Sequence, residues 1–248
     1  MTLEQFFAEN REVAIAFSGG VDSAYLLYAA TRYAARVKAY YVSTAFQPEF
    51  ELADARRLAD ELGADMLVLH VDVLSNSAVT ANPSDRCYHC KNMLFRQILR
   101  AAENDGFPVL LDGTNASDDA GDRPGMRALR ELSVRSPLRE CGLTKAEIRR
   151  LSKEAGLFTW DKPAYACLAT RIRTGEEITL QKLKQTEKAE GFLFELGFRD
   201  FRVRMVDNTA KLELRETDLP LLLENREKIV TELRKDYDSV LLNLEVRK

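Results

Sequence analysis

The sequence predicts an α/β protein, a doubly wound parallel sheet followed by a smaller α+β domain. Over the first two thirds of the chain, short continuous apolar runs alternate with stretches of helical spacing. Such runs indicate strands buried on both faces, which form parallel sheets when helices separate them. From about residue 170 the pattern changes to helices and short alternating strands. We therefore expect one domain over 1–169 and a second over 170–248.

The elements of the first domain follow in order. Helical spacing over 48–62 places apolar side chains on one face. Over 143–157 an amphipathic helix has Thr144 at its start and Glu147 three residues on, which is a capping-box pattern. The predicted strands are VAIAF at 13–17, KAYYV at 38–42, DMLVLHV at 65–71 and PVLLDG at 108–113.

The second domain is predicted to contain two helices and three strands. Its strands alternate apolar and polar residues, as half-buried strands do. The helices are expected over 178–196 and 218–237, and the strands over 201–207, 210–215 and 239–246.

The composition disfavours two classes of function, general nucleic-acid binding and membrane insertion. The chain has 248 residues and a formal net charge of −3, which does not favour a general nucleic-acid binder. No apolar run approaches the length of a membrane span, and the first residues lack a basic segment followed by an apolar core. We expect a cytoplasmic protein without nucleic-acid or membrane partners.

A glycine-containing turn joins the first strand to a helix. Ser18, Gly19 and Gly20 end the apolar run, and Asp22 and Ser23 follow. Glycines let the backbone approach an anion, and a helix start offers free N–H donors, so this arrangement suits a phosphate, with Asp22 holding Mg²⁺. The alternative is a tight turn with Asp22 and Ser23 as helix caps. Gly-Lys-Ser/Thr and G-x-G-x-x-G patterns are absent, which disfavours a kinase-type or dinucleotide loop.

A second loop, LLDGTNASDD at 110–119, leaves a buried strand at the same predicted sheet edge. Gly113 and Thr114 in this loop are candidates for nucleotide binding, as is Ser43 after the second strand. The alternative is an ordinary polar loop with an aspartate cap.

Three of the four cysteines suggest sulfur or metal chemistry. Cys87 and Cys90 are spaced to share one face near a helix start, where thiolates are favoured, and Cys167 lies in a loop with basic residues. Zinc would need a fourth ligand such as His89 or Cys141, although Cys141 fits a structural role better. Three thiolates instead suit a [4Fe-4S] cluster with one open iron.

The string AFSGGVDSAYLL resembles the pyrophosphate loop of the ATP-pyrophosphatase (PP-loop) superfamily. This resemblance implies the adenine nucleotide α hydrolase-like fold and cleavage of ATP between its α and β phosphates. In this reaction a substrate oxygen, often that of a carboxylate, is adenylated and is then displaced by a nucleophile.

Four further segments, DRCYHCK, GTNASDDAGDRPGMRAL, VRSPLRECGLTKAEIRRLSKEAGL and WDKPAYACLATRI, resemble the LarE family of sulfur transferases in nickel-pincer cofactor synthesis. The resemblance implies that a pyridinium biscarboxylic acid mononucleotide is converted to a thiocarboxylate, and it suggests a homo-oligomer. Sulfur comes either from Cys167 itself, which becomes dehydroalanine, or from a sulfide donor through a [4Fe-4S] cluster on Cys87, Cys90 and Cys167. The presence of all three cysteines favours the cluster-bearing type.

The same resemblance assigns roles to further residues. Lys91 would stabilise ATP phosphate or the departing pyrophosphate. Arg202 and Arg204, two apart on a predicted strand, would hold a substrate phosphate, with Arg171 and Glu190 as additional substrate-site residues.

Two other classes are consistent with parts of the pattern. One is a tRNA-thiolating or amidating PP-loop enzyme, but no basic stripe supports RNA binding and an amidating ligase has no need of three thiols. The other is a non-catalytic nucleotide or cluster sensor, which would not release pyrophosphate.

Overall fold

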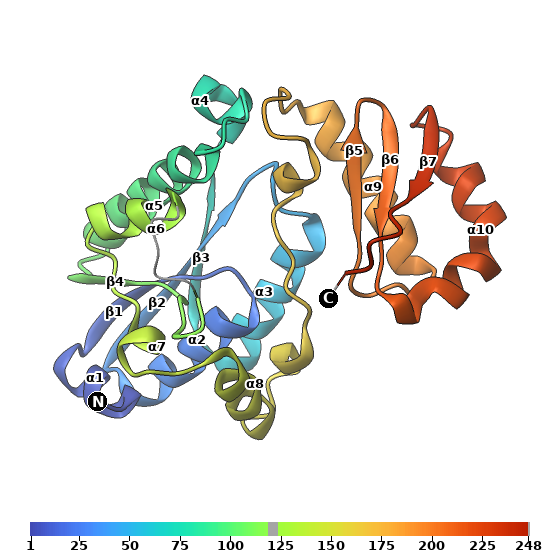
Figure 1. Cartoon of the computed structure of the whole chain (residues 1–248). Helices are drawn as coiled ribbons and strands as arrows, with labels where there is room; N and C mark the ends of the chain where they lie inside the picture. The colour runs from blue at the N-terminus through green and yellow to red at the C-terminus, as the bar shows by residue number, and fades with distance from the viewer. Residues whose placement is uncertain (119–123, 248) are drawn as a thin grey trace. The chain divides into compact units, whose positions relative to one another are not determined.

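The computed structural model describes residues 1–118 and 124–247. Its first sheet has four strands in the order β3-β2-β1-β4, and all three strand pairs are parallel (Figure 1). This confirms the predicted parallel sheet. The strands are β1 (Glu12–Ala16), β2 (Arg36–Ser43), β3 (Asp65–His70) and β4 (Val109–Leu111). The first strand therefore lies inside the sheet, while β3 lies at its edge and is partly exposed.

Helices separate these strands as expected. The α-helices of the described residues are α1 (Leu3–Glu9), α2 (Val21–Tyr33), α3 (Glu49–Leu62), α4 (Ser77–Thr80), α5 (Arg86–Asn104), α6 (Pro124–Glu131), α7 (Pro137–Glu140), α8 (Lys145–Glu154), α9 (Leu180–Glu195) and α10 (Leu219–Leu233). Short 3₁₀ turns are η1 (Val73–Ser75), η2 (Phe158–Asp161), η3 (Leu168–Arg171) and η4 (Glu216–Asp218). The Thr144 side chain accepts from the Glu147 N–H at the start of α8, which confirms the capping box.

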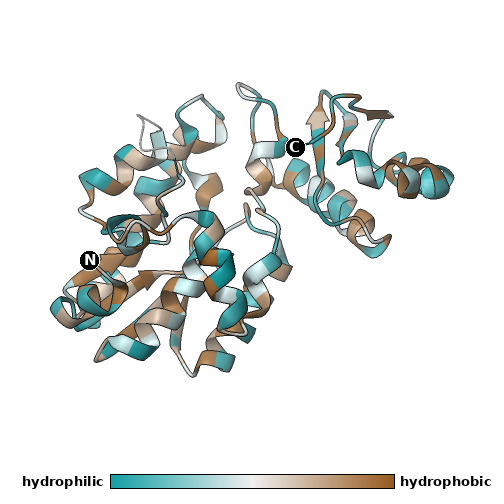
Figure 2. Cartoon of the chain, turned by 60° about the horizontal axis from the view of Figure 1, so that its bottom comes forward, coloured by the Kyte–Doolittle hydropathy of each residue, from teal (hydrophilic) through white to brown (hydrophobic). Residues whose placement is uncertain are grey.

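Both faces of the parallel sheet are covered. Val13 and Ile15 of β1 pack into a core with residues of α1, α2, α3 and α8. Ala14, between them, points to the other face and packs with Ile98 and Ala102 of α5. Because neighbouring side chains of one strand enter two cores, the sheet is doubly wound. Figure 2 shows hydrophobic and hydrophilic residues interspersed along the helices, as expected for amphipathic helices.

The C-terminal part forms a separate small sheet in the order β5-β6-β7. Strands β5 (Arg202–Val206) and β6 (Thr209–Glu213) are antiparallel, whereas β7 (Ser239–Leu242) runs parallel to β6. Val203 and Met205 pack with residues of α9 and α10 in one core. The predicted α+β character is confirmed, and the last strand ends four residues earlier than expected. The chain bends at Leu244, which is 87% exposed, although the N–H groups of Asn243 and Arg247 still donate to the Leu212 and Leu214 carbonyls.

Contacts divide the chain into two compact units. Unit 1 comprises residues 1–72 and 85–162, and unit 2 comprises residues 73–84 and 163–248. The segment 73–84 joins unit 2 through Asn82, whose side chain donates to the Ile172 and Arg173 carbonyls and whose own carbonyl accepts from the Gly175 N–H. No sequence pattern predicted that residues 73–84 belong to unit 2. That residues 1–169 form a PP-loop ATP pyrophosphatase domain and residues 170–248 a substrate-binding and oligomerisation domain stays a prediction.

Within the described residues, the helices are too short or too polar to cross a bilayer.

Candidate functional site

The glycine loop follows β1 and begins α2. Gly19 has φ +71°, and a Cβ there would lie 3.3 Å from the Ala55 Cβ of α3, so a side chain would be strained by both conformation and space. Gly20 is the N-cap of α2, and no side chain caps this helix start. The first N–H groups of α2 therefore lie at the carboxyl end of the internal strand β1 without a side-chain cap, and such a helix start can bind phosphate.

Two serine hydroxyls shape the loop. Ser18 Oγ and Ser23 Oγ are 3.0 Å apart, and the Ser23 hydroxyl donates to the Gly20 carbonyl over 3.1 Å. The Ser18 N–H donates to Ser23 Oγ at 3.3 Å. Asp22 and Ser23 lie inside the helix, where Gly20 is the N-cap, so they do not cap α2 as the alternative interpretation predicted.

Asp22 is held by a residue that the sequence analysis missed. Its Oδ2 accepts from Lys145 Nζ at 2.6 Å, whereas its buried Oδ1 has no partner within the described residues. Burial raises the pKa of Asp22, against the opposing effect of Lys145. A carboxylate with one unpartnered oxygen beside a phosphate-binding helix start fits a Mg²⁺ ligand. The available signal for Lys145 was its place at the first position of a capped helix.

The second loop lies directly against the first. A Cβ on Gly113 would lie only 2.9 Å from the Ser23 backbone nitrogen, so glycine is required there. The Thr114 hydroxyl donates to Asp112, whose other oxygen accepts from Ser136 at 2.6 Å. Gly113 is therefore brought to the start of α2, as predicted for strands that end at one sheet edge, and the nucleotide-binding role of Gly113 and Thr114 stays a prediction. Asp119, the last residue of the predicted loop, lies outside the described residues.

Ser43 ends β2, the strand that pairs with β1, and its carbonyl accepts from the Val71 N–H. It lies at the same edge of the sheet as the glycine loop.

Cys87 and Cys90 occupy the first turns of α5, as predicted. Cys87 is exposed and Cys90 partly exposed, and Arg86 Nη2 lies 3.8 Å from Cys87 Sγ. His89 is engaged by Asp85, with Nε2 and Oδ2 3.3 Å apart. The stem of Lys91 passes α6, where a Cβ on Gly125 would lie 3.1 Å from Lys91 Cδ.

The other two cysteines have different surroundings. Cys141 packs against the first core, and burial raises the pKa of its thiol, which agrees with a structural role. Cys167 belongs to unit 2, where it is the N-cap of η3. Within the described residues, no three or more Cys, His, Asp or Glu side chains gather as a metal site.

Arg171 and Glu190, predicted at the substrate site, form a buried pair in unit 2. Each side chain is 1% exposed, with Arg171 Nε 2.7 Å from Glu190 Oε1 and Nη2 3.1 Å from Oε2. Burial opposes the charge of Arg171, but the bonds to Glu190 raise its pKa above the ordinary value. As placed, the two side chains are directed at each other, and their contact with substrate stays a prediction.

Arg202 and Arg204 lie on the face of β5 opposite Val203 and Met205. Burial first, and then the charges of Arg171 and Arg247, lower the pKa of Arg202 to about 10. Arg204 is more open, with its side chain 40% exposed, and donates to Glu213 Oε1 at 2.7 Å.

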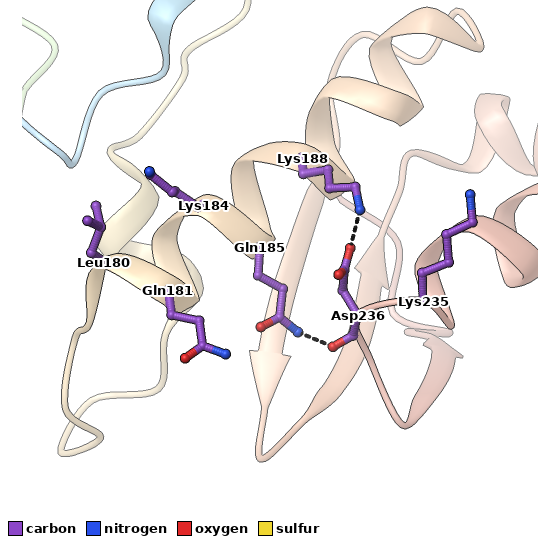
Figure 3. Close-up of a pocket in the computed structure, with 7 residues that line it drawn as sticks. All are labelled: Leu180, Gln181, Lys184, Gln185, Lys188, Lys235 and Asp236. Atoms are coloured by element: carbon purple, nitrogen blue, oxygen red, sulfur yellow. Dashed lines mark hydrogen bonds and ion pairs between the residues drawn. The ribbon is translucent and has the colours of Figure 1, made fainter.

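A groove in unit 2 lies along α9 and the turn before β7, outside every predicted site (Figure 3). Lys188 and Gln185 both bind Asp236 there, at 2.6 Å and 2.5 Å. Asp236 offsets the charge of Lys188, and the groove carries no proposed function.

A glycine loop of this geometry, on a doubly wound sheet and beside a carboxylate suited to Mg²⁺, defines the PP-loop class of ATP-using enzymes. A family model described as asparagine synthase matches residues 4–119. The pyridinium-3,5-bisthiocarboxylic acid mononucleotide synthase of Lactiplantibacillus plantarum is 34% identical, over 87% of this chain and 79% of its own. The chain belongs to the family of that enzyme, the LarE family, and is an ATP-dependent sulfurtransferase.

Two uncharacterized proteins are also similar to the chain. One, from Synechocystis, is 40% identical over 86% of this chain and 80% of its own. The other, from Methanocaldococcus jannaschii, is 32% identical over 96% of this chain and 91% of its own.

Proposed function

We propose that the protein converts carboxylates of pyridinium-3,5-biscarboxylic acid mononucleotide into thiocarboxylates at the expense of ATP, in nickel-pincer cofactor synthesis. The observation that carries the proposal is the close packing of Gly113 on the start of α2, beside Gly19 and Asp22. This arrangement joins two loops around one uncapped helix start, as a bound diphosphate requires. The similarity to the synthase of Lactiplantibacillus plantarum supports the choice of substrate.

In the first step, a carboxylate oxygen of the substrate attacks the α-phosphorus of ATP. The bond to the bridging oxygen breaks and pyrophosphate leaves, which gives an acyl adenylate. The uncapped N–H groups at the start of α2 support phosphate binding there, and we propose that the Lys91 ammonium also binds phosphate charge and that Asp22 would hold Mg²⁺, which neutralises this charge. Ser18, Ser23, Ser43 and Thr114 complete the proposed nucleotide site.

In the second step, sulfur forms a bond to the acyl carbon as the bond to the AMP oxygen breaks. With hydrosulfide as the nucleophile, its proton is released and AMP leaves with the electron pair. We propose that Cys87, Cys90 and Cys167 are ligands of a [4Fe-4S] cluster, because two accessible thiols share one turn of α5 and thiolates are the ligands such clusters take. When bound, such a cluster supplies an iron without a protein ligand at which sulfide can be held.

Arg202 and Arg204 are proposed to bind the phosphate of the mononucleotide. Their shared face of β5 and the partial exposure of Arg204 support this role.

We further propose a homo-oligomer supplied by an external sulfide donor. Light scattering of the purified protein tests the oligomer, and sulfide titration tests the donor.

The experiment is anaerobic reconstitution with iron and sulfide, followed by turnover with Mg·ATP and the pyridinium dicarboxylate. More than one thiocarboxylate per chain, with matching AMP and pyrophosphate, is the expected result. At most one thiocarboxylate per chain, with loss of the mass of H₂S at Cys167, would replace the cluster route by the sacrificial one. Nucleotide binding without pyrophosphate release would contradict the proposed function and favour a sensor.

A further inference from the structure

Tyr165, two residues before Cys167, is held on three sides. Its hydroxyl donates to Glu190 Oε2. The guanidinium groups of Arg171 and Arg202 lie over its ring, 4.8 Å and 5.4 Å from the ring centroid. Such contacts restrict the ring in both position and direction.

Glu190 links Tyr165, which precedes Cys167 in the chain, to Arg171, which follows it. Besides the hydroxyl and both bonds from Arg171, the carboxylate accepts from the Val203 N–H at 2.9 Å. Four donors fill the acceptor positions of one carboxylate. Glu190 is therefore fully engaged by protein groups in the described structure.

The backbone around Cys167 is fixed by the same network. Three carbonyls accept from arginines, with Ala166 bound by Arg171, Ala164 by Arg202 and Thr170 by Arg204. The Cys167 carbonyl accepts from the Thr170 hydroxyl at 2.8 Å, and that hydroxyl accepts from Arg171. The loop is thus tied down on both sides of the thiol-bearing residue.

We propose that Tyr165 and Glu190 are positioning residues for Cys167, which act through Arg171 and the loop backbone. The inference rests on the proposed function, because it gives the network a task in the sulfur-transfer step. Cys167 is a proposed ligand of the cluster that would present the sulfide, and a misplacement of about 1 Å in a catalytic arrangement can cost about a hundredfold in rate, so a rigid loop matters at this position. Removal of the Tyr165 hydroxyl leaves Arg202 and Arg204, the proposed ligands of the substrate phosphate, in place, so the adenylation step at the glycine loop of unit 1 should change little.

The test is Tyr165→Phe, which keeps the ring and removes one hydroxyl. Its matched control is Tyr40→Phe, which removes a similar tyrosine–carboxylate hydrogen bond, 2.6 Å to Asp105, in unit 1. Three quantities are measured: the pyrophosphate burst with its KM for the acceptor acid, the rate of thiocarboxylate formation, and the hydrogen exchange of amides 164–170 in the protein as isolated.

For Tyr165→Phe, we expect thiocarboxylate formation to slow by about tenfold, the ratio that corresponds to one hydrogen bond of ordinary strength. Exchange of amides 164–170 should rise, the pyrophosphate burst and its KM should stay within twofold, and Tyr40→Phe should change none of these. Unchanged thiocarboxylate formation, unchanged exchange, or a raised KM for the acceptor acid would overturn the proposal. Absence of a pyrophosphate burst in the unmodified protein would defeat the proposed function, while the exchange measurement would still decide whether the network holds the loop.

Discussion

The backbone of Gly113 lies so close to Ser23 that a Cβ atom would sit 2.9 Å from the Ser23 nitrogen. This contact joins the loop after β4 to the start of α2. The two loops therefore form one surface, and substitutions at either one should affect nucleotide binding.

Gly113→Ala should force the two loops apart. We expect a loss of about 1–3 kcal/mol in unfolding free energy from overpacking, together with a clear rise in the Kd for ATP. Denaturant unfolding and calorimetric titration measure the two effects. Gly191→Ala in α9 is the control, because a Cβ there meets open space and should leave stability equal or slightly higher. Equal ATP affinity in the two variants would show that the contact does not shape the site.

Lys145→Met should weaken nucleotide binding by removing the cation 2.6 Å from Asp22. Without Lys145 the Asp22 carboxylate is no longer fixed at the proposed Mg²⁺ position, so the KM for Mg·ATP should rise by about tenfold, which corresponds to about 1.4 kcal/mol of binding free energy. The control is Arg150→Gln on the same helix, which breaks only an exposed pair with Glu154. An unchanged KM in Lys145→Met would mean that the lysine has no part in the nucleotide site.

Cys87→Ser should lower the iron retained after anaerobic reconstitution and limit each chain to at most one thiocarboxylate. The reason is that a cluster with one thiolate fewer is held more weakly. Cys141→Ser is the matched control. Cys141 packs against the core, so this variant should leave the iron content unchanged. Full iron content and repeated turnover in Cys87→Ser would exclude Cys87 as a ligand.

Stability should fall as pH rises above about 10, the ordinary tyrosine value. Burial raises the pKa of Tyr237 to about 12 and also raises the pKa values of Tyr40 and Tyr41. Between these pKa values the unfolded chain loses tyrosine protons that the folded chain keeps, so the stability present below pH 10 declines by up to about 1.4 kcal/mol per pH unit for each tyrosine.

Urea unfolding between pH 9 and 11.5 measures this slope, and Tyr237→Phe should reduce it. An equal slope in the variant would show that Tyr237 does not contribute to the alkaline loss.

Local signals predicted most of the fold. Continuous apolar runs gave all four parallel strands, and Thr144 with Glu147 gave the start of α8, because these features depend on neighbours in sequence. The excursion of 73–84 into unit 2 depends on Asn82, which binds residues some ninety positions later in the chain, and no local pattern reports such a pairing.

Local motifs also predicted part of the candidate site. The glycine loop and the helical turn with Cys87 and Cys90 follow from short motifs. Lys145 and Tyr165 were not predicted as site residues, because an isolated lysine or tyrosine belongs to no motif. Their partners, Asp22 and Glu190, are distant in sequence.

The central claim is that the glycine loop binds ATP so that a substrate carboxylate attacks its α-phosphorus. The most direct measurement uses the pyridinium dicarboxylate with ¹⁸O in its carboxylates and follows the label by mass spectrometry after turnover with Mg·ATP. The account predicts AMP that carries one ¹⁸O for each thiocarboxylate formed, with unlabelled pyrophosphate. Label in inorganic phosphate, or formation of ADP in place of AMP, would contradict it.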